Sequence, residues 1–185
     1  MRTFIVLLVL LLTPVPVSAA EESGVVLPDT MDLGGQSLVL NGLGLRQKFV
    51  FDVYVGGLYL PAANSDAEAV LGADEPRYMV MHFLRDVDAE SINDAWFEGL
   101  EDNTPGFSQE LFDQFESLSK WMEDVPDQGV LTFAYVPGQG TTVTVLGTDK
   151  GVLPGKAFAD ALLACWIGPE PGPGESFKEA VLGLE

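Results

Sequence analysis

The 185-residue chain is strongly acidic, with 28 Asp and Glu residues against 9 Lys and Arg and a net charge of −19. Such a surface repels phosphate backbones and anionic head groups, so the average charge argues against nucleic-acid and membrane-surface partners. One histidine and one cysteine, far apart in sequence, make no zinc set, and a lone cysteine cannot form an intramolecular disulfide. The composition therefore predicts no metal and no cofactor.

The N-terminus is typical of a secretory signal peptide. Met1-Arg2 precedes the apolar run Phe4 to Leu12, and the small residues Ser18-Ala19-Ala20 follow, with cleavage predicted after Ala20. That run is too short for a permanent anchor, and no later segment is apolar for long enough to span a bilayer. We therefore expect residues 1–20 to be removed, residues 21–185 to form one domain, and the protein to be periplasmic or secreted.

Several segments have the pattern of strands. Residues 37–60 are predicted to be one extended, central strand, because apolar side chains occupy both of its faces. Gly56-Gly57 within it predicts a bulge or a close approach of another group to the backbone. Residues 77–84 alternate in the same two-sided way, and residues 130–136 and 141–146 flank a turn rich in glycine that is typical of a hairpin.

Helical spacing predicts five helices, over residues 65–72, 88–103, 111–122, 155–167 and 175–182. Ser65 with Glu68 forms a capping box for the first, and Asp88 is the predicted N-cap of the second. These strands and helices do not alternate as βαβ units. The predicted fold class is therefore α+β, with a mainly antiparallel β-sheet and a layer of α-helices packed on one face.

Standard catalytic signatures are missing from the sequence, which has no nucleophile elbow, phosphate-binding loop or dinucleotide fingerprint. The segment Asn41-Gly42-Leu43-Gly44-Leu45-Arg46 is a candidate site instead. Glycines on either side of a bend would let a ligand approach the backbone and bring the Arg46 guanidinium to a carboxylate or phenolate. The alternative role for Arg46 is a salt bridge to one of the acidic residues.

Other candidates are residues with a polar tip in an apolar setting. Tyr54, in a predicted central strand, must find a partner or face a cavity. His82 is more typical of a structural histidine, since it lies in an apolar strand. Three further candidates lie on predicted apolar helical faces, namely Trp96, Cys165 and Trp166. Such residues can belong to the core or contact a ligand.

Four stretches together resemble the chalcone isomerase family. Leu40–Arg46 and Val53–Leu60 resemble its paired strands. Lys156–Gly168 resembles its late helix, and Ser176–Leu184 resembles its last helix. With Trp96, the Tyr135–Gly138 hairpin and the signal peptide, the chain is most similar to the exported bacterial chalcone-isomerase-like group. The resemblance covers nearly all of residues 21–185.

The resemblance implies a sheet layered with helices and a ligand cleft between them. In the plant enzymes an arginine after the glycine-rich bend binds the negatively charged flavonoid oxygen, and Arg46 matches it. The family's strand threonine is replaced by Tyr54 and its late-helix threonine by Cys165, while its helix tyrosine and asparagine fall near Ala89 and Trp96. The hydroxyl network that would stabilise an enolate is therefore absent. Noncatalytic members of the fold bind fatty acids through an arginine.

The leading hypothesis is a noncatalytic protein that binds a small amphipathic anion such as a fatty acid or an aromatic acid. Arg46 would hold the acidic group, and the side chains lining an apolar cleft would be Tyr54, Trp96, Cys165 and Trp166. One alternative is an isomerase, an intramolecular lyase, that acts on an unknown substrate through Arg46. Another is a structural or adaptor protein without a ligand, which a cleft filled by side chains would favour.

Overall fold

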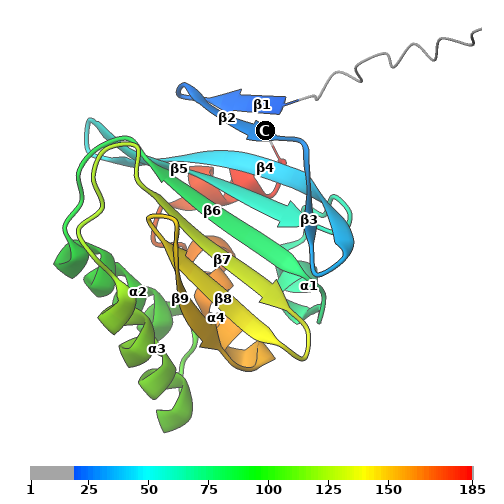
Figure 1. The fold of residues 1–185 in the computed structure, drawn as a ribbon, viewed down its shortest axis with the longest axis vertical. Coiled ribbons are helices and arrows are strands. Elements are labelled where there is room, and N and C mark those ends of the chain that lie inside the picture. Colours follow the sequence, from blue (N-terminus) through cyan, green and yellow to red (C-terminus); the bar gives the residue numbers. More distant parts are fainter. Residues whose placement is uncertain (1–18, 185) are drawn as a thin grey trace, which may run out of the picture.

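A curled, seven-stranded antiparallel sheet forms one layer of the computed structural model, which describes residues 19–184 (Figure 1). The strands follow one another in chain order, namely β3 (Thr30–Leu33), β4 (Gln36–Lys48), β5 (Phe51–Leu60), β6 (Arg77–Phe83), β7 (Val130–Val136), β8 (Gly140–Val145) and β9 (Thr148–Leu153). A separate hairpin joins β1 (Ala19–Glu22) to β2 (Val25–Pro28).

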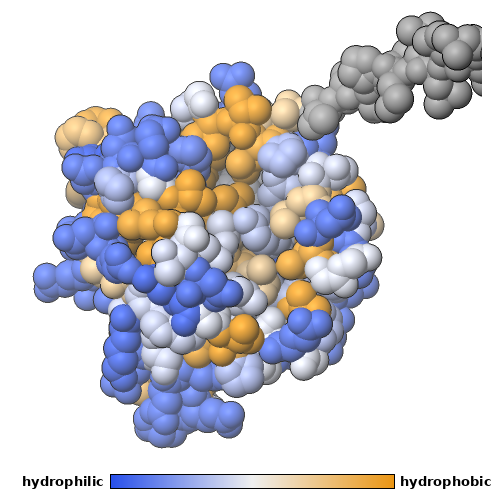
Figure 2. Space-filling view, in the orientation of Figure 1, coloured by the Kyte–Doolittle hydropathy of each residue, from blue (hydrophilic) through white to orange (hydrophobic). Residues whose placement is uncertain are grey.

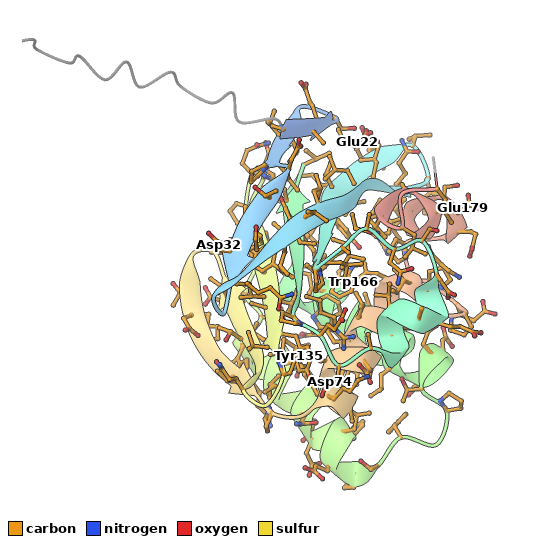
Figure 3. All side chains as sticks on the ribbon, turned by 90° about the vertical axis from the view of Figure 1, so that its right-hand side faces the viewer. Glu22, Asp32, Asp74, Tyr135, Trp166 and Glu179 are labelled. Atoms are coloured by element: carbon orange, nitrogen blue, oxygen red, sulfur yellow. The ribbon has the colours of Figure 1, made fainter. Side chains whose placement is uncertain are left out.

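Helices form the second layer, over one face of the sheet, and Figure 3 shows strands on one side and helices on the other. They are α1 (Ala67–Gly72), α2 (Ala89–Asn103), α3 (Gln109–Trp121), α4 (Lys156–Ile167) and α5 (Glu175–Val181). The predicted α+β class, with its antiparallel sheet and single helical layer, is confirmed. None of these helices within residues 19–184 has the length and apolar character needed to cross a bilayer.

The prediction of one strand over residues 37–60 is wrong, because the chain reverses at Phe49-Val50 and its two halves pair as β4 and β5. The turn carries no glycine, proline or asparagine, so the sequence gives no turn signal there. Phe49 instead takes a left-handed φ of 60°, and its side chain is 92% exposed. Large side chains rarely adopt this conformation, so the hairpin is held by its long strands rather than by its turn residues.

The helix N-caps and the short and edge strands differ in part from the sequence predictions. The N-cap of α1 is Asp66, whose carboxylate accepts the Ala69 N–H, and not Ser65. The predicted N-cap Asp88 is confirmed by its bond to the Ser91 N–H. The short strands β1 to β3 and the edge strand β9 were not predicted, because they bury few side chains and lack a sustained apolar alternation.

The glycines of β4 and β5 admit helix α5, not a ligand, to the sheet. A Cβ on Gly42 would lie 2.1 Å from the Ala180 carbonyl oxygen, and one on Gly56 would lie 2.5 Å from the Phe177 ring. The predicted close approach at Gly56 is thus confirmed, whereas the predicted bend over residues 41–46 is a continuous strand with a bulge between Leu40 and Gly42. The Asn41 side-chain amide donates to the Val181 carbonyl and secures the end of α5.

The main core lies between the sheet and the helices. Its largest fully buried side chains include Phe83 from β6, Phe115 from α3, Phe158 from α4 and Phe177 from α5. Burying each such ring stabilises the fold by roughly 1.5–3 kcal/mol relative to exposure. A smaller cluster on the opposite face of the sheet contains Leu38, Tyr59 and Val80.

Candidate functional site

A cleft of about 270 Å³ opens between the sheet strands β5 and β6 and the helices α2 and α4. Its walls include the five residues of the ligand-binding hypothesis, namely Arg46, Tyr54, Trp96, Cys165 and Trp166. The structure thus brings together residues from three distant parts of the chain. Their role in binding stays a prediction, which the geometry below makes specific.

Arg46 lies at the rim of the cleft, in β4 just before a bulge in the pairing of β4 with β5. One guanidinium N–H donates to the Gly172 carbonyl oxygen at 2.9 Å, and the guanidinium carbon lies 6.0 Å from the centre of the Tyr54 ring. This single bond uses one of the five N–H donors of an arginine. Arg46 makes no ion pair with the described residues, so the alternative of a structural salt bridge does not apply.

Tyr54 and Trp166 meet at the inner end of the cleft. The Trp166 Nε1–H donates to the Tyr54 hydroxyl oxygen at 3.1 Å, and both side chains are buried. Figure 3 shows Trp166 between the sheet and the helical layer. Burial raises the pKa of Tyr54 to about 12, although the nearby Arg46 charge and the Trp166 bond act in the opposite direction. The Tyr54 hydroxyl therefore keeps its proton at neutral pH and can donate it to a ligand.

Trp96 also lines the cleft, and its indole N–H is an unused donor. Its side chain is 3% exposed, yet its Nε1–H has no hydrogen-bond partner among the described residues. Its ring meets the rings of Trp166 and Phe133 edge to face, with centroids 5.3 Å and 5.5 Å away. The Nε1 atom is itself buried, and a buried donor without a partner costs roughly 1–3 kcal/mol.

Cys165 lies deeper, where α4 packs against α2. A Cβ on Gly99 would lie 2.7 Å from its Sγ, so the glycine allows this close contact between the helices. The thiol donates weakly to the Ala161 carbonyl oxygen at 3.5 Å. Burial raises the pKa of Cys165 to about 12, which keeps the thiol protonated and unreactive at neutral pH. It is an apolar wall of the cleft rather than a nucleophile.

The rim of the cleft gathers basic side chains that have no carboxylate partner. Of the nine Lys and Arg in the chain, Arg2 lies outside the described residues and five others form ion pairs. The remaining three are Arg46, Lys48 and Arg85, and all three line the cleft. In a chain with 28 acidic residues, this concentration of unpaired positive charge favours an anionic ligand at the rim.

Two aspartates also line the rim, but both are engaged by backbone. Asp86 accepts the Asp127 N–H at 2.7 Å, and Asp88 accepts the Ser91 N–H at 2.7 Å as the N-cap of α2. This hydrogen bond to the Ser91 backbone lowers the pKa of Asp88. Their carboxylates hold the loop before α2 in place. His82, the single histidine, does not line the cleft and lies 3.1 Å from the Gln128 amide oxygen.

The sequence interpretation gave no site role to the rim residues Lys48, Phe49, Phe51, Arg85, Asp86 and Asp88. The first three surround the unpredicted β4–β5 turn, so they were placed inside a strand. Arg85 follows β6, and its guanidinium carbon lies 4.6 Å from the centre of the Phe51 ring. The available signal was the scarcity of cations, because two of the few basic residues, Arg46 and Lys48, directly precede the apolar turn.

The fold and the cleft define an α+β open-faced sandwich with a ligand-sized cavity between its layers, lined by both apolar and charged side chains. The model of the family described as chalcone isomerase-like matches residues 19–183. The chain therefore belongs to the chalcone isomerase-like family, as the sequence resemblance predicted.

A solved structure with the same fold is that of an Arabidopsis thaliana fatty-acid binding protein. It superposes with a TM-score of 0.68 and 20% sequence identity, over 90% of this chain and 97% of the plant chain. A comparison with curated proteins finds no match. At this identity the superposition establishes the shared fold.

Proposed function

We propose that this protein binds a small amphipathic acid without converting it. The observation that carries the proposal is the pairing of an apolar cleft with unpaired cations at its rim. Arg46 holds the carboxylate, and the Tyr54 hydroxyl beside it supplies a second donor. The fatty-acid binding protein of the same fold supports this choice of ligand class.

The cleft is large enough for a small organic acid. Its volume of about 270 Å³ is many times the roughly 10–15 Å³ that a single water needs on the same measure. A medium-chain fatty acid and an acid with one aromatic ring are simple members of this ligand class. Octanoic acid and cinnamic acid are therefore the first ligands to test.

The isomerase alternative lacks the two threonine hydroxyls of the plant enzymes. Tyr54 and Cys165 replace the two threonines of the plant enzymes, and burial moves the pKa of each to about 12, away from neutrality. A cleft filled by side chains would have favoured the adaptor alternative, whereas the cleft is open. These observations favour ligand binding over both alternatives.

The direct test is calorimetric titration of the purified protein with octanoic acid. Arg46→Ala removes a charge-assisted bond worth roughly 1.5–3 kcal/mol, so the affinity is expected to fall by about tenfold or more. Arg46→Lys retains the charge without the planar guanidinium, so its affinity is expected to lie between those of the native protein and Arg46→Ala. Lys120→Ala is the matched control, because this exposed lysine pairs with Glu116 and does not line the cleft.

Two outcomes would contradict the proposal. Equal affinity of the native protein and Arg46→Ala would remove Arg46 as the anchor, and conversion of a chalcone or another enone above the buffer rate would favour the isomerase. Extraction of the protein from its native host, followed by mass spectrometry, should reveal the resident acid. An empty extract with no response to either test acid would favour the adaptor.

Export to the periplasm or beyond is part of the proposal. The family match begins at Ala19, just before the predicted cleavage point, which supports a leader separate from the domain. The rest of the predicted signal peptide, residues 1–18, lies outside the described residues. Cell fractionation with N-terminal sequencing tests both points, and a protein that stays in the cytoplasm with Met1 intact would refute them.

A further inference from the structure

The β4–β5 hairpin ends in an exposed apolar turn at the rim of the cleft. Phe49, Val50 and Phe51, named here the apolar tip, have side chains that are 92%, 84% and 54% exposed. Figure 2 shows hydrophobic surface at the upper left, where the hairpin ends in Figure 1, directly beside hydrophilic surface. Three consecutive exposed apolar residues at a loop end are unusual for a protein surface and mark an interaction site.

The backbone of the apolar tip is also unfavourable for the fold. Phe49 has a left-handed φ of 60°, a conformation that asparagine or glycine adopts more easily. The turn thus combines a strained backbone with an exposed ring, and neither feature stabilises the domain. Strain that the fold does not require is typical of positions kept for binding.

The charge around the apolar tip differs from that of the rest of the chain. Lys48 precedes it, and Arg85 lies over the Phe51 ring. Together with Arg46, these are the cations without an ion pair among residues 19–184. The nearby Asp52 carboxylate accepts a bond from the Gln47 side chain, and Asp86 and Asp88 are held by backbone N–H groups.

We propose that the apolar tip docks the protein on an anionic lipid bilayer, with Phe49, Val50 and Phe51 in the interface and Lys48 and Arg85 on the head groups. Charges more than about 8 Å from the bilayer are largely screened at physiological salt, so the acidic remainder of the surface does not prevent this contact. The negative net charge of the chain therefore does not exclude a membrane-surface partner at the apolar tip. Docking would bring the mouth of the cleft to the membrane.

The docking proposal goes beyond ligand binding and is tested without a ligand. The measurement is flotation of the native protein with vesicles of phosphatidylglycerol and phosphatidylcholine in equal parts, compared with vesicles of phosphatidylcholine alone. The protein is expected to float with the mixed vesicles and to be released by molar salt. Lys48→Ala should lower the partition coefficient about fivefold.

The decisive pair of variants places the same change at two positions. Val50 belongs to the apolar tip but does not line the cleft, whereas Val152 is a 50% exposed valine of the edge strand β9. Val50→Asp is expected to reduce vesicle binding about tenfold or more. Val152→Asp, which adds the same charge elsewhere, should change it by less than about twofold, and octanoic acid binding should be retained in both.

Several results would overturn the docking proposal. Native protein that floats with neither vesicle, or variants that lose vesicle binding equally, would refute it. A dimer in solution that dissociates in Val50→Asp, without vesicle binding, would assign the apolar tip to a second copy of the chain. Failure of octanoic acid to bind while flotation persists would refute the ligand proposal alone, so the two can be separated.

Discussion

The indole N–H of Trp166 and the hydroxyl oxygen of Tyr54, 3.1 Å apart, join helix α4 to strand β5 at the inner end of the cleft. Both groups are buried, so neither can exchange its partner for water without opening the core. The bond therefore fixes the distance between the two layers where the ligand is proposed to lie. It also leaves the Tyr54 proton free for a ligand.

Tyr54→Phe should destabilise the protein by roughly 1–3 kcal/mol, because it leaves the Trp166 N–H buried without an acceptor. Chemical denaturation at neutral pH measures this change. A double-mutant cycle with Trp166→Phe separates the bond from the lost packing, and we expect a coupling energy of roughly 0.5–3 kcal/mol. Additive effects of the two substitutions would show that the bond does not stabilise the fold.

High pH should unfold the protein through its tyrosines. Burial raises the pKa of Tyr54 and Tyr59 from 10.0 to about 12, and it also raises the pKa of Tyr78 and of Tyr135. Between pH 10 and 12 the unfolded chain has lost protons that the folded protein retains. Stability is therefore complete below pH 10 and falls as the pH rises, by about 3 kcal/mol for Tyr54 alone.

The measurement for this pH prediction is tyrosinate absorbance recorded together with circular dichroism. Tyrosinate is expected to form only as the protein unfolds. The stability difference between the native protein and Tyr54→Phe should narrow as the pH rises above 10, because the variant lacks this titration. Tyrosinate that forms near pH 10 in a fully folded protein would contradict the prediction.

The fold was largely predictable because most of its elements carry strong local signals. Asp88 is a good N-cap before a helix with apolar residues at helical spacing, and the β7–β8 hairpin has a turn with Gly138 at a φ of 75°. The β4–β5 turn gave no such signal, since the chain places Phe49 where glycine or asparagine is expected. There the pairing of two long strands outweighs the local preference of the turn.

The candidate site was predicted in part for a related reason. Arg46 and Tyr54 could be located because the resemblance to a known family placed them in paired strands. The unused donor of Trp96 was invisible in the sequence, since it depends on which groups surround the indole in the folded core. Lys48 and Arg85 join the site only because the chain reverses at the missed turn.

Cys165 should resist thiol reagents in the folded protein. Burial raises the pKa of its thiol from 9.0 to about 12, which reduces the thiolate fraction at neutral pH about a thousandfold. The measurement is the rate of reaction with an aromatic disulfide reagent, before and after addition of guanidinium. Because Cys165 is the only cysteine, the signal has a single source. Rapid reaction of the native protein would show that the cleft opens to solvent as far as α4.

The last prediction concerns the cost of the apolar tip to the fold. Phe49→Asn places a residue that tolerates left-handed backbone at a φ of 60° and removes a 92% exposed ring. We expect this substitution to raise the free energy of unfolding by about 1 kcal/mol, measured by urea denaturation, and to weaken flotation with anionic vesicles. Val50→Asn is the neighbouring control. Because the backbone strain lies at Phe49, a substitution at Val50 should not relieve it. A loss of stability in Phe49→Asn would instead mean that the Phe49 ring supports the hairpin, and the tip would then be a structural feature.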